Sequence, residues 1–175
     1  MTIKSIFLDR DGVINRDTDY LHKIKEFEFL DGIFEACKHF QSLNFKIIII
    51  TNQSGIGRGY FSEIEYMKIT KWMINELNKN DVKILDIFHC PHAPESNCDC
   101  RKPKPGMFIA AKNKYNINMK ESWMVGDSER DITAASLAGI KNTILVRSGH
   151  QTDKENSQAK YQLNSIKDIR NTILF

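Results

Sequence analysis

The sequence predicts an α/β fold built on a doubly wound, mostly parallel sheet of the Rossmann-like type. Short apolar runs alternate with longer segments of helical periodicity, which is the pattern of repeated βα units. Polar and acidic residues directly follow several of these runs, at the strand ends where open α/β sheets bind ligands. Together these observations favour one domain over residues 1–175, with its functional site at one edge of the sheet.

Apolar runs define the predicted strands. The run ending at Ile50 contains consecutive isoleucines and is the strongest β pattern in the chain. The predicted strands are, in order, Ile3 to Leu8, Phe45 to Ile50, Ile84 to His89, Trp123 to Val125 and Thr143 to Val146.

Helical patterns separate the first strands. After Gly32, the residues Ile33, Cys37 and Phe40 share one helical face. Ser62 with Glu65 makes a capping box that predicts a helix start. The apolar stripe of that helix is expected to consist of Tyr66, Ile69, Met73 and Leu77.

The second half of the chain repeats the alternation. Pro105 suits the first turn of a helix that carries Phe108, and Gly139 suits the C-terminal cap of a helix that begins near Ser128. The polar segment 149–158 is expected to form a surface loop before a short terminal helix or strand.

Composition narrows the class of function. The chain has 175 residues, 41% of them hydrophobic, which is enough for a single core. No apolar stretch approaches the roughly 20 residues of a membrane span, and the N-terminus lacks a signal-peptide pattern, so we expect a cytoplasmic protein without membrane contact. The net charge of +3 forms no basic stripe, so nucleic acid is not an expected partner. We expect a monomer that acts on a small molecule.

The acidic pair Asp9 and Asp11 follows the first predicted strand. Asp and Gly are common in turns, so Asp9-Arg10-Asp11-Gly12 alone is a weak signal. In a phosphoryl-transfer site the two acids have different tasks: Asp9 attacks phosphorus, while Asp11 protonates the leaving oxygen and later deprotonates water. The other polar segments favour this reading.

Carboxylates that face a phosphate require positive charge, which magnesium supplies with oxygen ligands. Asp127 follows the strand Trp123 to Val125 and is predicted to be a ligand at the same sheet edge as Asp9. Asp131, one helical turn later, supports the ligands from behind or is a solvated acid in the first turn of a helix.

Thr51 and Lys102 are predicted to hold the transferring phosphoryl group. Thr51 ends the isoleucine-rich run, where its hydroxyl and the following amides can reach phosphoryl oxygens. Lys102 balances negative charge, and Arg101 can grip a second phosphate bidentately. The alternative for Arg101 and Lys102 is a solvated basic pair. In the glycine-rich segment 55–59, Arg58 is a candidate for binding an anionic substrate group.

The segment 90–100 predicts an inserted zinc loop. It places three cysteines and a histidine in C-x-H and C-x-C pairs, which suits a closed tetrahedral site that stabilises the loop and performs no catalysis. The alternatives are disulfides or reduced cysteines without a partner. The predicted ligands are Cys90, His92, Cys98 and Cys100.

Together these motifs resemble those of the haloacid dehalogenase superfamily, and more closely its D-glycero-D-manno-heptose 1,7-bisphosphate phosphatases. The resemblance extends from about Ile6 to Val146 and is carried by FLDRDGVIN, TNQSGIGRGYF, CPHAPESNCDCRKPKPGM and MVGDSERD. It implies a magnesium-dependent phosphatase that removes the 7-phosphate of the heptose bisphosphate through an aspartyl-phosphate, in nucleotide-activated heptose biosynthesis. Predicted elements fill the stretches between the motifs, so we expect no separate cap domain.

The resemblance implies Asp9 as nucleophile, Asp11 as general acid and base, and Thr51 and Lys102 as stabilisers of the phosphoryl group. It also implies magnesium held by Asp9, Asp127 and the backbone carbonyl of Asp11. Ser128 stands where some relatives carry a basic substrate-contacting residue. Family substrate contacts correspond here to Asp17, Thr18, Asp19, Tyr20, Asn52, Gln53, Ser54 and Arg101.

Three other functions agree less well with these motifs. Histidinol-phosphate phosphatases share the zinc loop and the DRDG segment, but the loop Ser54 to Gly59 looks more like that of the heptose enzymes. A zinc-stabilised binding domain without activity is disfavoured by the intact acidic and basic motifs. A nucleic-acid 3′-end phosphatase would need a basic groove with stacking aromatics, whereas the charges here are scattered.

Overall fold

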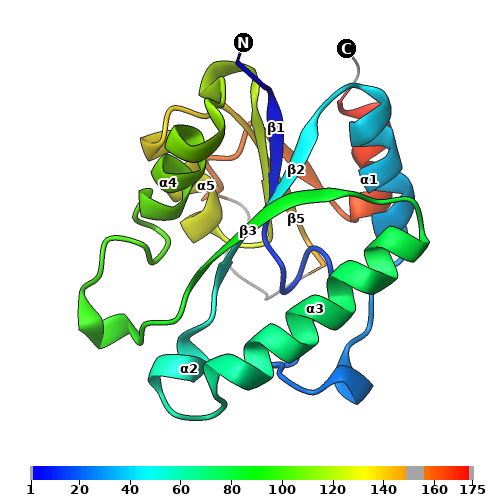
Figure 1. Cartoon of the computed structure of the whole chain (residues 1–175). Helices are drawn as coiled ribbons and strands as arrows, with labels where there is room; N and C mark the ends of the chain where they lie inside the picture. Colours follow the sequence, from blue (N-terminus) through cyan, green and yellow to red (C-terminus); the bar gives the residue numbers. More distant parts are fainter. Residues whose placement is uncertain (1, 149–155, 174–175) are drawn as a thin grey trace.

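The computed structural model describes residues 2–148 and 156–173. Its centre is an all-parallel sheet with the strand order β3-β2-β1-β4-β5-β6, and helices cover both faces (Figure 1). This confirms the predicted α/β class and the doubly wound topology. No separate cap is present in the described part of the chain.

The predicted strands are confirmed, with small changes at their ends. The second strand continues through Thr51 to Asn52, because its partner β3 extends as far as Cys90. A sixth strand follows the segment 149–158, of which residues 149–155 lie outside the described residues. The strands are β1 (Ser5–Leu8), β2 (Lys46–Asn52), β3 (Ile84–Cys90), β4 (Trp123–Gly126), β5 (Asn142–Val146) and β6 (Tyr161–Leu163).

The helices begin and end near the predicted signals. Ser62 and Glu65 form the expected capping box, and Gly139, at φ +93°, follows the C-terminal end of α5. Pro105 caps α4 instead of lying in its first turn. The α-helices are α1 (Ile33–Ser42), α2 (Ser54–Gly57), α3 (Glu63–Lys79), α4 (Gly106–Tyr115) and α5 (Glu129–Leu137). The 3-10 helices are η1 (Ile24–Glu26), η2 (Pro94–Ser96), η3 (Met119–Glu121) and η5 (Ile166–Asn171).

Two apolar clusters fix the helices to the sheet. On one face, α1, α3 and η5 pack against β1 and β2 through residues such as Phe40, Met73 and Ile169. On the other face, α4 and α5 pack against the sheet through Phe108 and Ala135. Figure 1 shows these two helices together on that side. Strands β1 and β2 are buried on both faces, which explains why their sequences are continuously apolar.

The strand order places a topological switch point between β1 and β4. From β1 the chain builds outward to β2 and β3, and then it returns to the other side of β1 to build β4, β5 and β6. The helices that follow β1 and β4 therefore lie on opposite faces of the sheet. This leaves a crevice at the carboxyl ends of these strands, where such sheets bind ligands.

Candidate active site

The predicted nucleophile and magnesium aspartate meet at this switch point. Asp9 follows the last residue of β1, and Asp127 follows the last residue of β4. The Asp9 amide donates to the Val125 carbonyl at 3.1 Å, which ties the two strand ends together. Carboxylate oxygens of Asp9, Asp127 and Asp131 all lie within 4.8 Å of one another, so they form a cluster that can hold a metal ion.

Gly12 allows the loop after β1 to approach Asp127 closely. Its φ is +84°, and a Cβ atom at this position would lie 2.2 Å from Asp127 Oδ2. A side chain here would be both strained and in steric conflict with the proposed ligand. Only glycine therefore lets the loop that carries Asp11 lie against the Asp127 carboxylate.

Lys102 is the cation of this cluster. Its side chain is 2% exposed, and its Nζ contacts Asp9 Oδ1 at 2.9 Å and Asp131 Oδ1 at 2.6 Å. Nζ also donates to the Ile50 carbonyl at 2.8 Å. Burial by itself lowers the pKa of Lys102, but the carboxylates of Asp131 and Asp9 outweigh it and hold the pKa above its usual value. The alternative of a solvated lysine is excluded.

The carboxylates around Asp9 bring more negative charge than the single positive charge of Lys102 can balance. Burial raises the pKa of Asp9 well above its usual range; Lys102 opposes this, and the nearby carboxylates of Asp131, Asp127 and Asp11 add to it. Its Oδ1 accepts from the Arg10 amide at 2.8 Å as well as from Lys102. The charge balance and the oxygen-rich donor set fit a hard cation such as magnesium.

Asp131 is buried, which excludes the alternative of a solvated acid. One of its oxygens contacts Lys102, and the other accepts from the Ser128 amide at 3.2 Å in a capping box at the start of α5. A Cβ atom on Gly126 would lie 2.3 Å from Asp131 Cβ, so this glycine at the end of β4 makes room for the Asp131 side chain. The side chain thus connects the helix start to Lys102.

Hydrogen-bond donors surround Asp11. Arg10 donates to both carboxylate oxygens at distances of 2.9 to 3.2 Å, and Asn15 Nδ2 donates to Oδ1 at 2.9 Å. Gln53 Nε2 donates to Oδ2 at 3.0 Å. Asp11 still lines the site cavity, with its side chain 19% exposed.

Polar side chains at the end of β2 form hydrogen bonds to neighbouring parts of the site. Thr51 is buried, and its hydroxyl accepts a hydrogen bond from Gln53 Nε2 at 2.8 Å. The side-chain amide of Asn52 pairs with the backbone of Lys102, donating to its carbonyl and accepting from its amide, each at 3.1 Å. Asn52 therefore fixes the position of the segment that carries the site lysine.

A polar cavity of about 350 Å³ opens over these groups. It brings together most of the predicted site residues, including those of the loops after β1 and β2. Thr18 and Thr51 are not among the residues that line it. The predicted residues in the lining are Asp9, Asp11, Asp17, Asp19, Tyr20, Asn52, Gln53, Ser54, Arg58, Arg101, Lys102 and Asp127.

Basic groups face this cavity from different elements. Arg101 lines it, and its Nη1 is buried without a hydrogen-bond partner among residues 2–148 and 156–173. Arg58 also lines the cavity, and its Nη2 lies 3.8 Å from Glu95 Oε1. The sequence analysis did not single out Arg130, which lines the cavity and donates from Nε to Ser128 Oγ at 3.3 Å. Arg130 is the second residue of α5 and lies within the MVGDSERD segment three positions after Asp127, which is the signal in the sequence that points to it.

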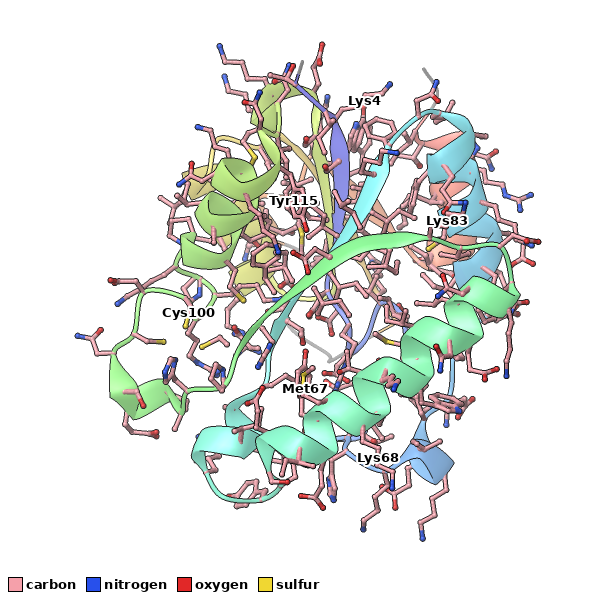
Figure 2. The ribbon with its side chains drawn as sticks, in the orientation of Figure 1. Lys4, Met67, Lys68, Lys83, Cys100 and Tyr115 are labelled. Atoms are coloured by element: carbon pink, nitrogen blue, oxygen red, sulfur yellow. The ribbon has the colours of Figure 1, made fainter. Side chains whose placement is uncertain are left out.

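The four predicted zinc ligands come together in the loop after β3, where Figure 2 shows Cys100. Their sulfur atoms lie 3.1 to 3.5 Å apart, and His92 Nδ1 lies 3.2 Å from Cys100 Sγ. A disulfide needs about 2.05 Å between sulfurs, so none is present among them. The donor set is that of a closed structural zinc site.

The loop 90–100, which carries this cluster, also makes contacts with other parts of the site. The Pro91 carbonyl accepts from the Gly57 amide at 2.8 Å, and the Cys90 carbonyl accepts from the Gln53 amide at 2.7 Å. Arg101 and Lys102 follow the last cysteine directly. The loop therefore connects the segment after β2 to Arg101 and Lys102.

Comparison with known proteins agrees with the fold and the site. A family model described as HAD-hydrolase-like matches residues 99–169. A solved structure of D,D-heptose 1.7-bisphosphate phosphatase from B. bronchiseptica, complexed with magnesium and phosphate, superposes with a TM-score of 0.87 at 30% identity, covering 97% of each chain. Fold and site thus define a hydrolase of the haloacid dehalogenase superfamily.

Sequence relatives give the family. The chain is 48% identical over 164 residues to a D-glycero-alpha-D-manno-heptose-1,7-bisphosphate 7-phosphatase of Photorhabdus laumondii, covering 90% of each protein. It is 44% identical over 173 residues to a D-glycero-beta-D-manno-heptose-1,7-bisphosphate 7-phosphatase of Pasteurella multocida, covering 95% of this chain and 94% of the relative. The chain therefore belongs to the D-glycero-D-manno-heptose-1,7-bisphosphate 7-phosphatase family.

One further property concerns membranes. None of the helices in the described part of the chain combines the length and the apolar character that crossing a membrane requires.

Proposed function

We propose that this protein hydrolyses the 7-phosphate of D-glycero-D-manno-heptose 1,7-bisphosphate through an aspartyl-phosphate intermediate. The observation that carries the proposal is the buried contact of Lys102 with Asp9, beside Asp127 and at the switch point of the sheet. The names of the relatives support the substrate and favour it over histidinol phosphate. The same intact groups argue against a binding domain without activity.

In the first step an Asp9 carboxylate oxygen attacks the phosphorus of the 7-phosphate. The bond between phosphorus and the sugar oxygen O7 breaks, and Asp11 gives its proton to O7, so that the heptose 1-phosphate leaves as an alcohol. Lys102 and the Thr51 hydroxyl stabilise the transferring phosphoryl oxygens. The phosphoryl group then remains on Asp9 as an acyl phosphate.

In the second step water hydrolyses this intermediate. Asp11, now a carboxylate, takes a proton from the water as the water oxygen attacks phosphorus, and the bond to Asp9 breaks. Inorganic phosphate leaves, and both aspartates return to their starting states. The cavity position of Asp11 supports this double task, because one group serves the leaving oxygen and the incoming water from the same side.

The proposal includes two metals with different tasks. Asp9, Asp127 and the backbone carbonyl of Asp11 would hold magnesium, which supplies positive charge to the phosphoryl group. Both Asp131 oxygens are already engaged, by Lys102 and the Ser128 amide, which favours a supporting role for this acid. Zinc at Cys90, His92, Cys98 and Cys100 is structural, because four protein ligands leave no open position.

Substrate recognition uses the loops around the cavity. The second phosphate, which does not react, would bind Arg101, with Arg58 as an additional contact. Sugar hydroxyl groups would bind polar side chains and amides of the segments after β1 and β2. The proposed substrate contacts of these segments are Asp17, Thr18, Asp19, Tyr20, Asn52, Gln53 and Ser54.

The proposal extends to the protein's setting. A site of zinc thiolates is stable in a reducing compartment, which supports a cytoplasmic location. We expect a monomer that needs no partner chain for the reaction, in nucleotide-activated heptose biosynthesis.

A substrate panel tests the function. Phosphate release with magnesium is measured for the alpha and beta anomers of the heptose bisphosphate, for histidinol phosphate and for 3′-phosphorylated DNA. Both anomers are included because relatives named for each match this chain. The proposal predicts the highest kcat/KM with one heptose bisphosphate anomer. Faster hydrolysis of histidinol phosphate would overturn it.

A further inference from the structure

We infer that Arg10 and Gln53 are positioning residues that hold the Asp11 carboxylate where it exchanges protons with the leaving oxygen and with water. The inference rests on the acid and base role of Asp11 in the proposed function. Arg10, which lies between the two catalytic aspartates, has no task in the phosphoryl-transfer motifs. Gln53 follows the strand that carries Thr51, and we assign it this task in addition to the substrate contact proposed above.

Arg10 grips Asp11 with a planar fork. Its Nε lies 3.1 and 3.2 Å from the two carboxylate oxygens, and its Nη2 lies 2.9 Å from each of them. A bidentate guanidinium fixes the plane and the direction of a carboxylate, whereas a lysine ammonium fixes only a point. The contact therefore determines how the Asp11 oxygens are oriented in the cavity.

Other parts of the chain fix the position of the Arg10 guanidinium. Nη2 donates to the Leu21 carbonyl at 3.2 Å, and the guanidinium carbon lies 5.9 Å from the centre of the Tyr66 ring on α3. Arg10 is 2% exposed, so its side chain has no room for the rotamers of a surface arginine. Because Arg10 contacts both the Leu21 carbonyl and the Tyr66 ring, it acts as a rigid support for Asp11.

Gln53 completes the support and connects it to the phosphoryl site. Its Nε2 donates to Asp11 Oδ2 at 3.0 Å and to Thr51 Oγ1 at 2.8 Å. With Asn15 on Oδ1, each oxygen of Asp11 accepts from Arg10 and from one side-chain amide. A carboxylate has about four acceptor positions, so this set occupies all of them. To carry the proton that it donates, Asp11 must first lose one of these hydrogen bonds, and the bond can form again once the proton has left.

A purely structural explanation of Arg10 is weak. Burying a guanidinium and a carboxylate carries a large desolvation penalty, and well-packed apolar side chains often serve stability equally well. The core on both sides of this sheet is built from such apolar side chains. The buried pair is instead located beside the reacting groups, with Asp11 lining the cavity.

Loss of Arg10 or Gln53 should have a specific kinetic effect. A poor leaving group needs its proton from Asp11 when the bond to phosphorus breaks, whereas a good leaving group departs as an anion. Loss of the positioning residues should therefore slow poor leaving groups selectively. A general loss of structure would slow all substrates by the same factor.

The experiment compares phenyl phosphate with 2,4-dinitrophenyl phosphate, which share an aryl group but differ in leaving-group basicity. The measured quantity is kcat/KM, which reports the phosphoryl-transfer step. For Arg10→Lys and Gln53→Met, general acid catalysis predicts a loss of about 100-fold with phenyl phosphate and less than about 5-fold with 2,4-dinitrophenyl phosphate. Asp11→Asn supplies the reference pattern, with a larger selective loss. Arg16→Lys, in an exposed pair with Glu28, should change neither.

The outcomes separate the inference from the proposed function. Equal losses on both substrates in Arg10→Lys and Gln53→Met, beside a selective loss in Asp11→Asn, would overturn the inference alone. A non-selective loss in Asp11→Asn would overturn the acid role on which it rests. Circular-dichroism melting and zinc content establish that each variant is folded. If Arg10→Lys does not fold, Gln53→Met decides by the same comparison.

Discussion

Lys102 Nζ lies 2.6 Å from Asp131 Oδ1, and the two side chains are 2% and 1% exposed. Asp131 comes from the first turn of α5, and Lys102 from the segment after the zinc loop. The contact thus joins two parts of the chain next to Asp9, the proposed nucleophile, which Lys102 also contacts. The contact fixes the position of the ammonium group, and removing either partner would leave a buried charge with one partner fewer.

The first prediction concerns the substitution Asp131→Asn, which removes the charged contact with Lys102. Supporting groups of metal sites typically contribute 10- to 100-fold, so we expect the magnesium concentration for half-maximal activity to rise by about that factor. The free energy of unfolding should fall by about 2 kcal/mol, as for the loss of a charged hydrogen bond. Magnesium titration of activity and urea unfolding measure these effects.

Asp168→Asn is the matched control. Asp168 forms the same capping box with Ser165 at the start of η5, but it is not among the residues of the site cavity. Its substitution should reduce stability by about 1 kcal/mol or less and leave the magnesium dependence unchanged. An unchanged magnesium dependence in Asp131→Asn as well would contradict the supporting role of Asp131.

Much of the fold and the site could be predicted from the sequence. The isoleucine-rich run of β2 and the acids after β1 and β4 identify a parallel sheet and its functional edge, because parallel strands end at one edge. The cluster of three cysteines and a histidine that could hold zinc follows from their spacing within one loop. Such signals are local, so a single sequence suffices to read them.

Other features depend on tertiary contacts that no local pattern encodes. The first-turn position of Asp131 fits a solvated acid equally well, and only the approach of Lys102 makes it a buried partner. Asn52 was predicted to contact substrate, yet its amide also binds the Lys102 backbone from 50 positions away in sequence. The cavity-facing position of Arg130 likewise depends on how α5 is set against the sheet.

The second prediction concerns Gly12. In Gly12→Ala the new methyl group meets Asp127 Oδ2 at 2.2 Å, on a backbone of φ +84°. Displacing the carboxylate proposed to bind magnesium and the loop that carries Asp11 should reduce kcat/KM by more than about 100-fold, because reacting groups tolerate little misplacement. Steady-state kinetics with 2,4-dinitrophenyl phosphate measures the loss.

Gly139→Ala is the control, because it introduces the same backbone strain at a positive φ without the steric conflict of Gly12→Ala. Gly139 has φ +93°, but its Cβ would meet only Met119 Cβ at 3.9 Å, which is ordinary contact. It should lose about 1 kcal/mol of stability from the left-handed backbone and keep its activity. If Gly12→Ala behaved in the same way, the close approach to Asp127 would have no functional importance.

The third prediction concerns zinc. Protein purified without chelator should contain about one zinc per chain, and Cys98→Ser should lose it together with several degrees of melting temperature. Elemental analysis and thermal unfolding measure both. Cys37→Ala is the control, because Cys37 is buried on α1 outside the cluster and should affect packing without loss of zinc. Absence of zinc from the wild-type protein would refute the assignment.

The fourth prediction concerns the second phosphate. Arg101→Ala should reduce the preference for the heptose bisphosphate over a small aryl phosphate by about 10- to 150-fold, the range for losing a charge-assisted contact of 1.5–3 kcal/mol. Lys104→Ala is the control, since Lys104 contacts Asp99 and Asn97 and is not among the residues of the cavity. Equal losses on both substrates in Arg101→Ala would place Arg101 in the phosphoryl-transfer step instead.

The most direct test of the central claim follows one reaction by phosphorus NMR, with heptose 1,7-bisphosphate, magnesium, and either the wild-type protein or Asp9→Asn. The wild type should convert the 7-phosphate resonance to inorganic phosphate and leave the 1-phosphate resonance intact. Asp9→Asn keeps the volume of the side chain but removes the nucleophile, so it should release no phosphate. Loss of the 1-phosphate instead, or turnover by Asp9→Asn within tenfold of the wild type, would contradict the account.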